Sequence, residues 1–171
     1  FVASRGGSYA SSRWDEDRSE EKTAVWFDAL SAIDARNVAG ADRIAMAAYQ
    51  AGRFDDAARW IARADKKSPM TRWIRAKLLL REGKLDRAAE HLAAAAEAFP
   101  SDERWTDLRC TLDHTWNTNF DFRPKLRTRG ELGTLRLARG KYVDALDLQI
   151  RSVHRADAAY VAERVLTIEE L

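Results

Sequence analysis

Cys110 and His114 are the two residues whose types most directly suggest chemistry. They lie four residues apart in a segment, about 103–116, whose apolar spacing predicts a helix, so the thiol and the imidazole would share one face. Both groups bind zinc, but a zinc site needs four protein ligands, or three and a water. Neither His91 nor His154 has a spacing that completes such a set. We therefore interpret these residues as packing residues and predict no metal and no cofactor.

Catalytic motifs are missing from the sequence. It contains no glycine-rich phosphate loop, no nucleophile elbow and no helix with paired zinc-binding histidines. Aspartates and glutamates are plentiful, but they are scattered over predicted solvent faces, so no two of them suggest an acid and a base. We expect this chain not to be an enzyme.

The stretch 123–155 is the most basic part of the chain, with nine basic and three acidic residues and a local net charge of +6. Such a stretch could meet a phosphate backbone or an acidic partner. The alternative is a solvated face balanced by acidic residues elsewhere in the fold, and no nucleic-acid motif supports the first interpretation. The basic residues are Arg123, Lys125, Arg127, Arg129, Arg136, Arg139, Lys141, Arg151 and Arg155, opposed by Glu131, Asp144 and Asp147.

Composition indicates an ordinary soluble globular chain. Of its 171 residues 46% are hydrophobic and 33% are charged, and the net charge is only +2. No apolar run reaches the ~20 residues that span a bilayer, so we expect no membrane insertion. The single cysteine leaves the compartment, cytoplasmic or periplasmic, undecided. Because the chain begins at Phe1 and Thr167 with Glu170 has the spacing of a capping box, we interpret it as a piece of a longer bacterial protein.

One phrase occurs twice in the chain. Ala51–Pro69 reads AGRFDDAARWIARADKKSP, and Glu82–Pro100 reads EGKLDRAAEHLAAAAEAFP, 31 residues further on. In each copy a glycine favours a left-handed turn between two helices, alanines allow the helices to approach closely, and a proline follows a helix that it cannot continue. The phrase therefore predicts an antiparallel pair of helices. Helices are predicted over about 17–36, 40–51, 54–66, 71–82, 85–98, 103–116 and 157–166, after a flexible arm over 1–16.

Small and apolar residues recur at fixed positions of this phrase. They are Gly52, Phe54, Ala57, Ile61, Ala64 and Pro69, then Gly83, Leu85, Ala88, Leu92, Ala95 and Pro100, and in a weaker third copy Leu132, Gly133, Gly140, Tyr142 and Ala145, with Gln149 at an apolar position. With these residues the chain resembles the tetratricopeptide repeat family over about 38–69, 70–100 and 127–155. It departs from the usual period of about 34 residues and carries an insertion at 101–126, where we expect the stack to kink or break.

The resemblance implies an all-α, right-handed solenoid of antiparallel helix pairs over residues 17–171. It also implies that the first helix of each pair lines a concave face that binds a protein or a peptide. On that face Tyr49 and Trp73 are candidate aromatic anchors, and Lys77 with Arg81 could hold a carboxylate; the other interpretation is that Trp73 is core and that both cations are solvated. The remaining positions carried over are Asp42, Met46, Gln50, Leu80, Thr134 and Leu137.

We therefore expect a non-enzymatic scaffold or adaptor. Two alternatives stay open, which are binding of nucleic acid or an acidic partner through the basic stretch, and a structural spacer between domains of a larger protein. Nucleic acid is the less favoured partner, because no motif supports it, and self-association into a homo-oligomer stays open.

Overall fold

The structure, a computed structural model, describes residues 25–30, 32, 38–106, 121–152 and 154–170. Apart from two short strands, the regular secondary structure of these residues is helical, so the fold class is all-α, as predicted. Residues 25–30 form one helical segment. The other elements are α2 (Ala41–Gln50), α3 (Phe54–Arg63), α4 (Pro69–Arg81), α5 (Leu85–Ala98), β1 (Trp105–Thr106), β2 (Asp121–Phe122), α6 (Pro124–Ala138), α7 (Tyr142–Ile150), α8 (Arg155–Arg164) and the 3₁₀ turn η2 (Ile168–Glu170).

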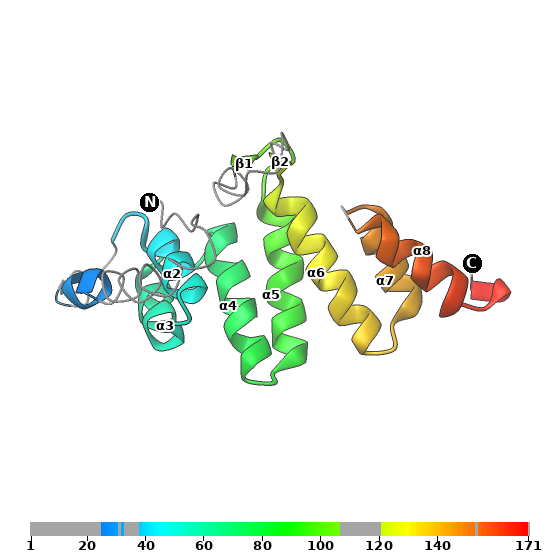
Figure 1. Cartoon of the computed structure of the whole chain (residues 1–171), viewed down its shortest axis with the longest axis horizontal. Helices are drawn as coiled ribbons and strands as arrows, with labels where there is room; N and C mark the ends of the chain where they lie inside the picture. Colours follow the sequence, from blue (N-terminus) through cyan, green and yellow to red (C-terminus); the bar gives the residue numbers. More distant parts are fainter. Residues whose placement is uncertain (1–24, 31, 33–37, 107–120, 153, 171) are drawn as a thin grey trace, which may run out of the picture.

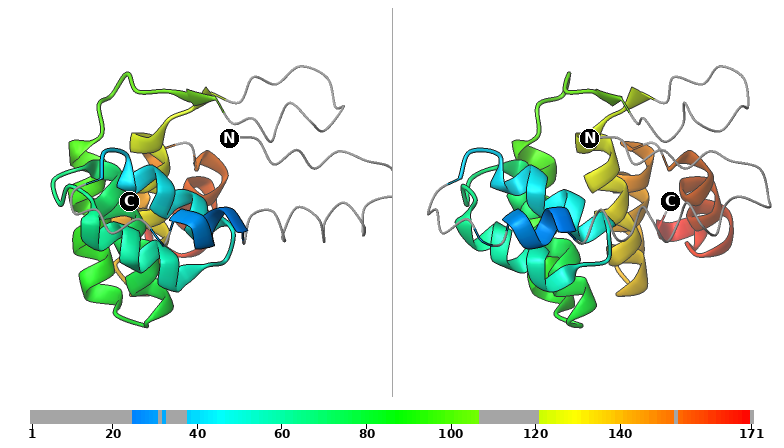
Figure 2. Two further views of the ribbon diagram at one scale, coloured as in Figure 1. Left: turned by 90° about the vertical axis from the view of Figure 1, so that its left-hand side faces the viewer. Right: turned by 60° about the vertical axis from the view of Figure 1, so that its left-hand side comes forward.

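The helices lie side by side along the long axis of the molecule, from α2 and α3 at one end to α8 at the other (Figure 1). From α4 onward each helix packs against the next, and α4 also contacts both α2 and α3. The two short strands pair antiparallel, Trp105 with Phe122, and they lie beyond the ends of α5 and α6 (Figure 2). The described helices therefore form one continuous row.

The same turn occurs three times in this row. Gly52, Gly83 and Gly140 have φ angles of 76°, 72° and 71°, in the left-handed region that favours glycine. The residue after each glycine donates its backbone N–H to the carbonyl five residues earlier, over 2.9–3.0 Å. This bond satisfies a carbonyl at the end of the first helix and reverses the chain within three residues. The repeated phrase thus encodes a repeated helix–turn–helix unit.

The boundaries of α2 to α5 and of α8 agree with the prediction to within a few residues. Pro69 follows the end of α3, as expected, but it is also the first residue of α4. Pro124 begins α6 in the same way, because the first turn of a helix needs no N–H from proline. Of the capping box predicted at the end, the contact of Glu170 is present: the backbone N–H and the hydroxyl of Thr167 both donate to its Oε2, at 3.0 and 3.1 Å.

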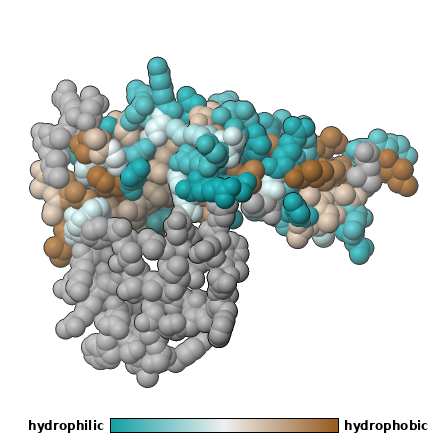
Figure 3. All heavy atoms as spheres, turned by 90° about the horizontal axis from the view of Figure 1, so that it is seen from above, coloured by the Kyte–Doolittle hydropathy of each residue, from teal (hydrophilic) through white to brown (hydrophobic). Residues whose placement is uncertain are grey.

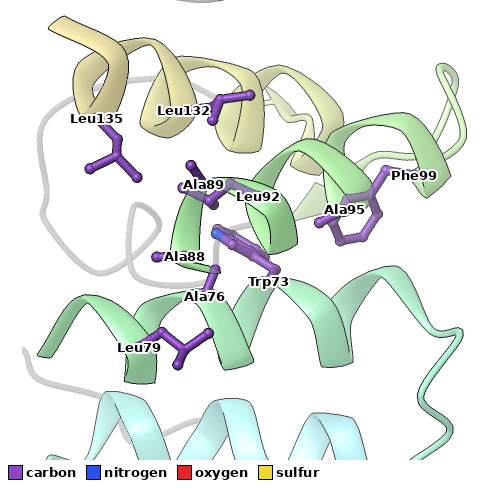
Figure 4. Packing of buried hydrophobic residues seen from close by; sticks show 10 residues of the cluster. All are labelled: Trp73, Ala76, Leu79, Ala88, Ala89, Leu92, Ala95, Phe99, Leu132 and Leu135. Carbon is purple, nitrogen blue, oxygen red and sulfur yellow. The ribbon is translucent and has the colours of Figure 1, made fainter. Parts of the chain in front are cut away.

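The largest core cluster joins α4, α5 and α6. Trp73 of α4 points towards α5, and Leu132 and Leu135 of α6 pack onto the other side of that helix (Figure 4). Small residues separate these large ones: Ala76 and Ala88 are fully buried where α4 meets α5. An alanine in this position lets two helix axes approach, so the expected role of the alanines is confirmed.

The helix predicted over about 103–116 is wrong at its start. Trp105 lies in β1, where it pairs with Phe122 of β2, and residues 107–120, with Cys110 and His114, lie outside the described residues. The expected break in the stack does not occur there, because α6 packs directly against α5. The predicted arm over 1–16 also lies outside the described residues.

Candidate functional site

The side chain of Glu131 lies where α4 and α6 approach each other. Its Oε2 accepts a hydrogen bond of 2.7 Å from Nε1 of Trp73, and its Oε1 lies 2.9 Å from Nζ of Lys77. Nε of Arg127, one turn earlier in α6, is 3.3 Å from the same Oε1. One carboxylate is therefore held by an indole, an ammonium and a guanidinium. The side chains of Glu131 and Lys77 are only 17% and 21% exposed, which strengthens their attraction compared with a fully solvated pair.

Lys77 lies between two aromatic rings. Its Nζ is 5.0 Å from the ring centre of Trp73 and 6.0 Å from that of Tyr49 in α2. Both distances fall within the range of cation–π attraction. Lys77 therefore connects α2, α4 and α6, and its position is fixed by neighbours from all three helices.

Arg81 lies one turn after Lys77, at the end of α4. It pairs with no carboxylate of the described residues, and the expectation that it and Lys77 hold a carboxylate of a partner stays a prediction. Its guanidinium lies over the ring of Phe54, 3.4 Å from the ring centre. Phe54 in turn contacts Tyr49 edge-to-face, with ring centres 5.3 Å apart. A continuous series of contacts thus runs from Arg81 through the two rings to Lys77.

Trp73 is a core residue, in agreement with the second of the two interpretations that the sequence left open. It is 4% exposed and contacts the rings of Phe99, Trp105 and Phe122 at 6.0–6.1 Å between centres. Trp105 and Phe122 also stack on each other, with ring centres 5.5 Å apart, so each short strand contributes one ring to the aromatic cluster. Trp73 keeps a polar role, because its Nε1 donates to Glu131.

The other carried-over positions divide between core and surface. Oδ2 of Asp42 accepts a bond of 2.7 Å from Oγ of Ser68, which ties α2 to the segment before α4. Met46 is half-buried and contacts two core clusters. Thr134 is exposed and its hydroxyl donates to the carbonyl of Gly130 within α6. Gln50 is exposed, whereas Leu80 and Leu137 are half-buried.

We use the name α2–α4–α6 face for the surface that Tyr49, Lys77, Arg81, Arg127 and Glu131 form. Sequence reasoning placed Tyr49, Lys77 and Arg81 there but treated Glu131 only as a charge opposing the basic stretch. The signal for Glu131 was weak, since only its spacing of four from Arg127 suggests an interaction. Its two partners in α4 lie 54 and 58 residues away, beyond the reach of any local pattern.

The basic stretch is neutralised in part by its own acidic residues and in part by acids elsewhere in the fold. Within the stretch Arg127 pairs with Glu131, and Arg151 with Asp147 at 2.7 Å. Arg129 and Arg139 reach across to α5, where they pair with Glu97 and Asp86. The two pairs with α5 are the arrangement that the balanced-face interpretation predicts. Of the remaining cations, Lys125, Arg123 and Arg136 are half-buried.

A second charged cluster, centred on Asp56 of α3, ties the N-terminal segment to the row. Asp56 is buried and accepts bonds from both Arg53 and Arg59, while Nη2 of Arg53 also lies 2.8 Å from Oδ1 of Asp28. Burial alone would raise the pKa of Asp56, but the bonds from Arg59 and Arg53 outweigh it and hold that pKa below its ordinary value. The hydrogen bond of Arg53 to Asp28, followed by its bond to Asp56, raises the pKa of Arg53. This cluster is a structural contact between helices.

Within the described ranges no group of three or more histidine, cysteine, aspartate or glutamate side chains could hold a metal ion. No helix in the same part of the chain has the length and apolar character needed to cross a bilayer. Comparisons of the sequence and the structure with family models, curated proteins and solved structures find no match.

Proposed function

We propose that this chain is a non-enzymatic protein- or peptide-binding module built as a tetratricopeptide-like solenoid. In this proposal α2–α3, α4–α5 and α6–α7 are antiparallel pairs of a right-handed superhelix, and the α2–α4–α6 face is its concave side. The three equal glycine turns and the continuous row of helices support this architecture. Stacked pairs of this kind expose a long surface suited to an extended or helical segment.

One observation carries the functional proposal: the α2–α4–α6 face already holds a carboxylate. Lys77 and Arg127 bind Glu131, although burial makes such an arrangement costly unless the geometry is favourable. Arg81 is exposed and stacks on Phe54. It presents a further cation on the same face, at the C-terminal end of α4. We therefore propose that the partner is a peptide with acidic side chains, bound by Arg81 and packed on Tyr49.

Short random peptides with fixed aspartate and glutamate positions are the probe for this proposal, beside the same pool with asparagine and glutamine in their place. The immobilised wild-type chain should enrich acidic peptides over the amide pool. A Tyr49→Ala/Arg81→Gln variant should lose that enrichment. A Tyr160→Ala/Arg155→Gln variant changes the same residue types on exposed parts of α8 and should keep it.

The Glu131→Gln variant provides an opposite test. It frees the charges of Lys77 and Arg127 for a ligand, so acidic peptides should bind several-fold more tightly than to the wild-type chain. Equal enrichment by the wild type and the Tyr49/Arg81 variant would contradict the proposal. Retention of nucleic acid in place of peptide, lost on nuclease treatment, would favour the basic stretch 123–155, and a chain that retains neither would favour the spacer.

A further inference from the structure

A second cationic cluster lies on the outer side of α4 and α5. It consists of Arg72 and Arg75 in α4 and of Arg87 and His91 in α5, and we call it the outer cluster. Arg75 precedes Lys77 by two residues, so it projects about 200° away from Lys77 around the axis of α4. The outer cluster is therefore separate from the α2–α4–α6 face.

Helix spacing and one cross-helix hydrogen bond bring these side chains together. Arg72 and Arg75 share a face of α4, and Arg87 and His91 share a face of α5, because residues three and four apart are neighbours on a helix. Nη1 of Arg72 donates a bond of 3.3 Å to the carbonyl of Ala94 in α5. Since the chain reverses between the two helices, Arg75 lies one turn further along α4 and faces the turn of α5 that contains His91.

The electrostatic environment of His91 agrees with this placement. Burial lowers the pKa of His91 most, and the positive charges of Arg75 and Arg87 lower it further, with a smaller contribution from Arg72. Glu90 acts in the opposite direction but does not cancel them. The positive charges of three guanidinium groups thus act on the His91 ring and, together with burial, favour its neutral form.

Within the part of the chain that the structure describes, Arg75 and Arg87 have no acidic partner. No ion pair joins Arg75 or Arg87 to a carboxylate of the described residues, although every side chain of the cluster is at least partly accessible. Two other cations near this helix are compensated: Arg129 and Arg139 both reach acidic residues of α5. Arg75 and Arg87 therefore leave two positive charges without an ion pair, among the described residues, on this side of α4 and α5.

We propose that the outer cluster is a binding site for a phosphate group. Guanidinium groups fit the oxygens of a phosphate in bidentate geometry, and several of them favour a compact dianion over a single carboxylate. A bound dianion would offset the repulsion among Arg72, Arg75 and Arg87. It would also stabilise the protonated form of His91, whose ring would then donate to a phosphate oxygen. The phosphate group can belong to a free small molecule or to a phosphorylated side chain of a peptide.

Inorganic sulfate is the first probe, because it stays a dianion throughout the relevant pH range. Binding is followed by calorimetry and by the NMR signal of the His91 ring, at constant ionic strength set with chloride. Because sulfate should raise the pKa of His91, affinity should increase as the pH falls and should decrease as the pH rises through that pKa. A His91→Asn variant should bind sulfate with no such pH dependence.

Charge removal tests the arginines. An Arg75→Gln/Arg87→Gln variant should bind sulfate and inorganic phosphate at least tenfold more weakly than the wild-type chain. An Arg155→Gln/Arg164→Gln variant has the same net charge, with both substitutions on exposed parts of α8, and should bind as the wild type does. Circular dichroism verifies that each variant is folded. If the double variant does not fold, the sulfate affinities of Arg75→Gln and Arg87→Gln are measured separately.

The source of the phosphate is then determined with three ligands: inorganic phosphate, a phosphoserine peptide and the same peptide with serine. Tighter binding of the phosphoserine peptide would indicate a phosphorylated partner, and equal binding of the first two a free phosphate compound. Sulfate affinity that is equal in the two double variants, or a His91 signal that does not respond to sulfate, would overturn the proposal.

Discussion

Nε1 of Trp73 donates a hydrogen bond of 2.7 Å to Oε2 of Glu131, across 58 residues of sequence. The bond joins the aromatic core to the charged surface, because the ring of Trp73 is buried against Phe99 while its one polar atom reaches the carboxylate. A buried indole N–H needs an acceptor, and Glu131 supplies one that also neutralises Lys77. The same contact thus stabilises the packing of α4 and α6 and determines the charge of the α2–α4–α6 face.

Replacing Glu131 by glutamine should lower the free energy of unfolding by about 1 kcal/mol. The amide oxygen can still accept from Trp73, but the attraction to Lys77 and Arg127 is lost, and partial exposure keeps that attraction modest. Urea unfolding followed by circular dichroism measures the change. Glu97→Gln is the matched control: its carboxylate is 78% exposed and 3.6 Å from Arg129, so its unfolding midpoint should stay near that of the wild type. An equal shift in both variants would contradict this role of Glu131.

The Asp56 cluster should make stability depend on acid pH. The pKa of Asp56 is lower in the folded chain than its ordinary value, so its contribution is fully present above the pKa of an unfolded aspartate, about 3.9. That contribution is lost as pH falls through the folded value. Asp56→Asn should cost about 1.5–3 kcal/mol at pH 7, because two arginines lose a charged acceptor.

Urea unfolding of the wild type and of Asp56→Asn at several pH values between 7 and 3 checks this prediction. The difference between their free energies of unfolding should narrow towards pH 3, because there Asp56 of the wild type takes up a proton on unfolding. Asp28→Asn serves as the control, since that carboxylate is 70% exposed and contacts only one of the two arginines. A difference in free energy of unfolding that stays constant over the whole range would show that the charge of Asp56 does not contribute to stability.

Replacing Gln149 should make the folded chain more stable. It is 1% exposed, and its Oε1 has no hydrogen-bond partner among the described residues. Gln149→Met keeps the length of the side chain and removes the unsatisfied acceptor, so it should stabilise the chain by about 1 kcal/mol. Thermal and urea unfolding measure the gain. Gln50→Met, at an exposed position of α2, should change stability by less than about 0.5 kcal/mol. A Gln149→Met variant that is less stable than the wild type would show that the amide makes a stabilising interaction.

Gly130 allows His154 to pack against the middle of α6. A Cβ at Gly130 would lie 1.9 Å from Cδ2 and 2.2 Å from Nε2 of His154. Alanine normally stabilises a helix interior by about 1 kcal/mol over glycine, but here the clash should reverse the sign and cost about 1–3 kcal/mol.

A double-mutant cycle with His154→Ala tests the cause. In the His154→Ala background the Gly130→Ala substitution should become stabilising, because the ring that it would meet is gone. Additive effects of the two substitutions would contradict a direct contact. The measurement is again the free energy of unfolding from urea titration.

The helices and the turns between them could be predicted from the sequence because their causes are local. Gly52 and Gly83 adopt the left-handed conformation that the repeated phrase requires, and the alanines near them are buried. These preferences depend on residues within one or two helical turns. The start of the insertion was wrong for the converse reason: Trp105 has an amphipathic helical spacing, but pairing with Phe122 and stacking on Trp73 place it in a strand.

Exposed apolar side chains illustrate the same division between local and tertiary causes. Val143, Ile150 and Ile168 are 52%, 61% and 88% exposed although their residue types favour burial. In Figure 3 apolar side chains are dispersed among polar ones at the C-terminal end of the row. A pattern of apolar residues indicates which face could be buried, whereas only the packing of the helices decides which face is.

The sequence by itself determined that this chain is all-α, where its helices turn, and that Tyr49, Lys77 and Arg81 belong to the first helices of two repeated units. Only the tertiary structure decided that the ring of Trp73 is core, that Lys77 binds Glu131, and that the positive charges of Arg75 and Arg87 act on His91. The physical reason is the distance along the sequence over which each kind of interaction acts. Backbone conformation responds to neighbours a few residues away, but a carboxylate finds its cation, or a cation remains without one, according to which helices pack side by side.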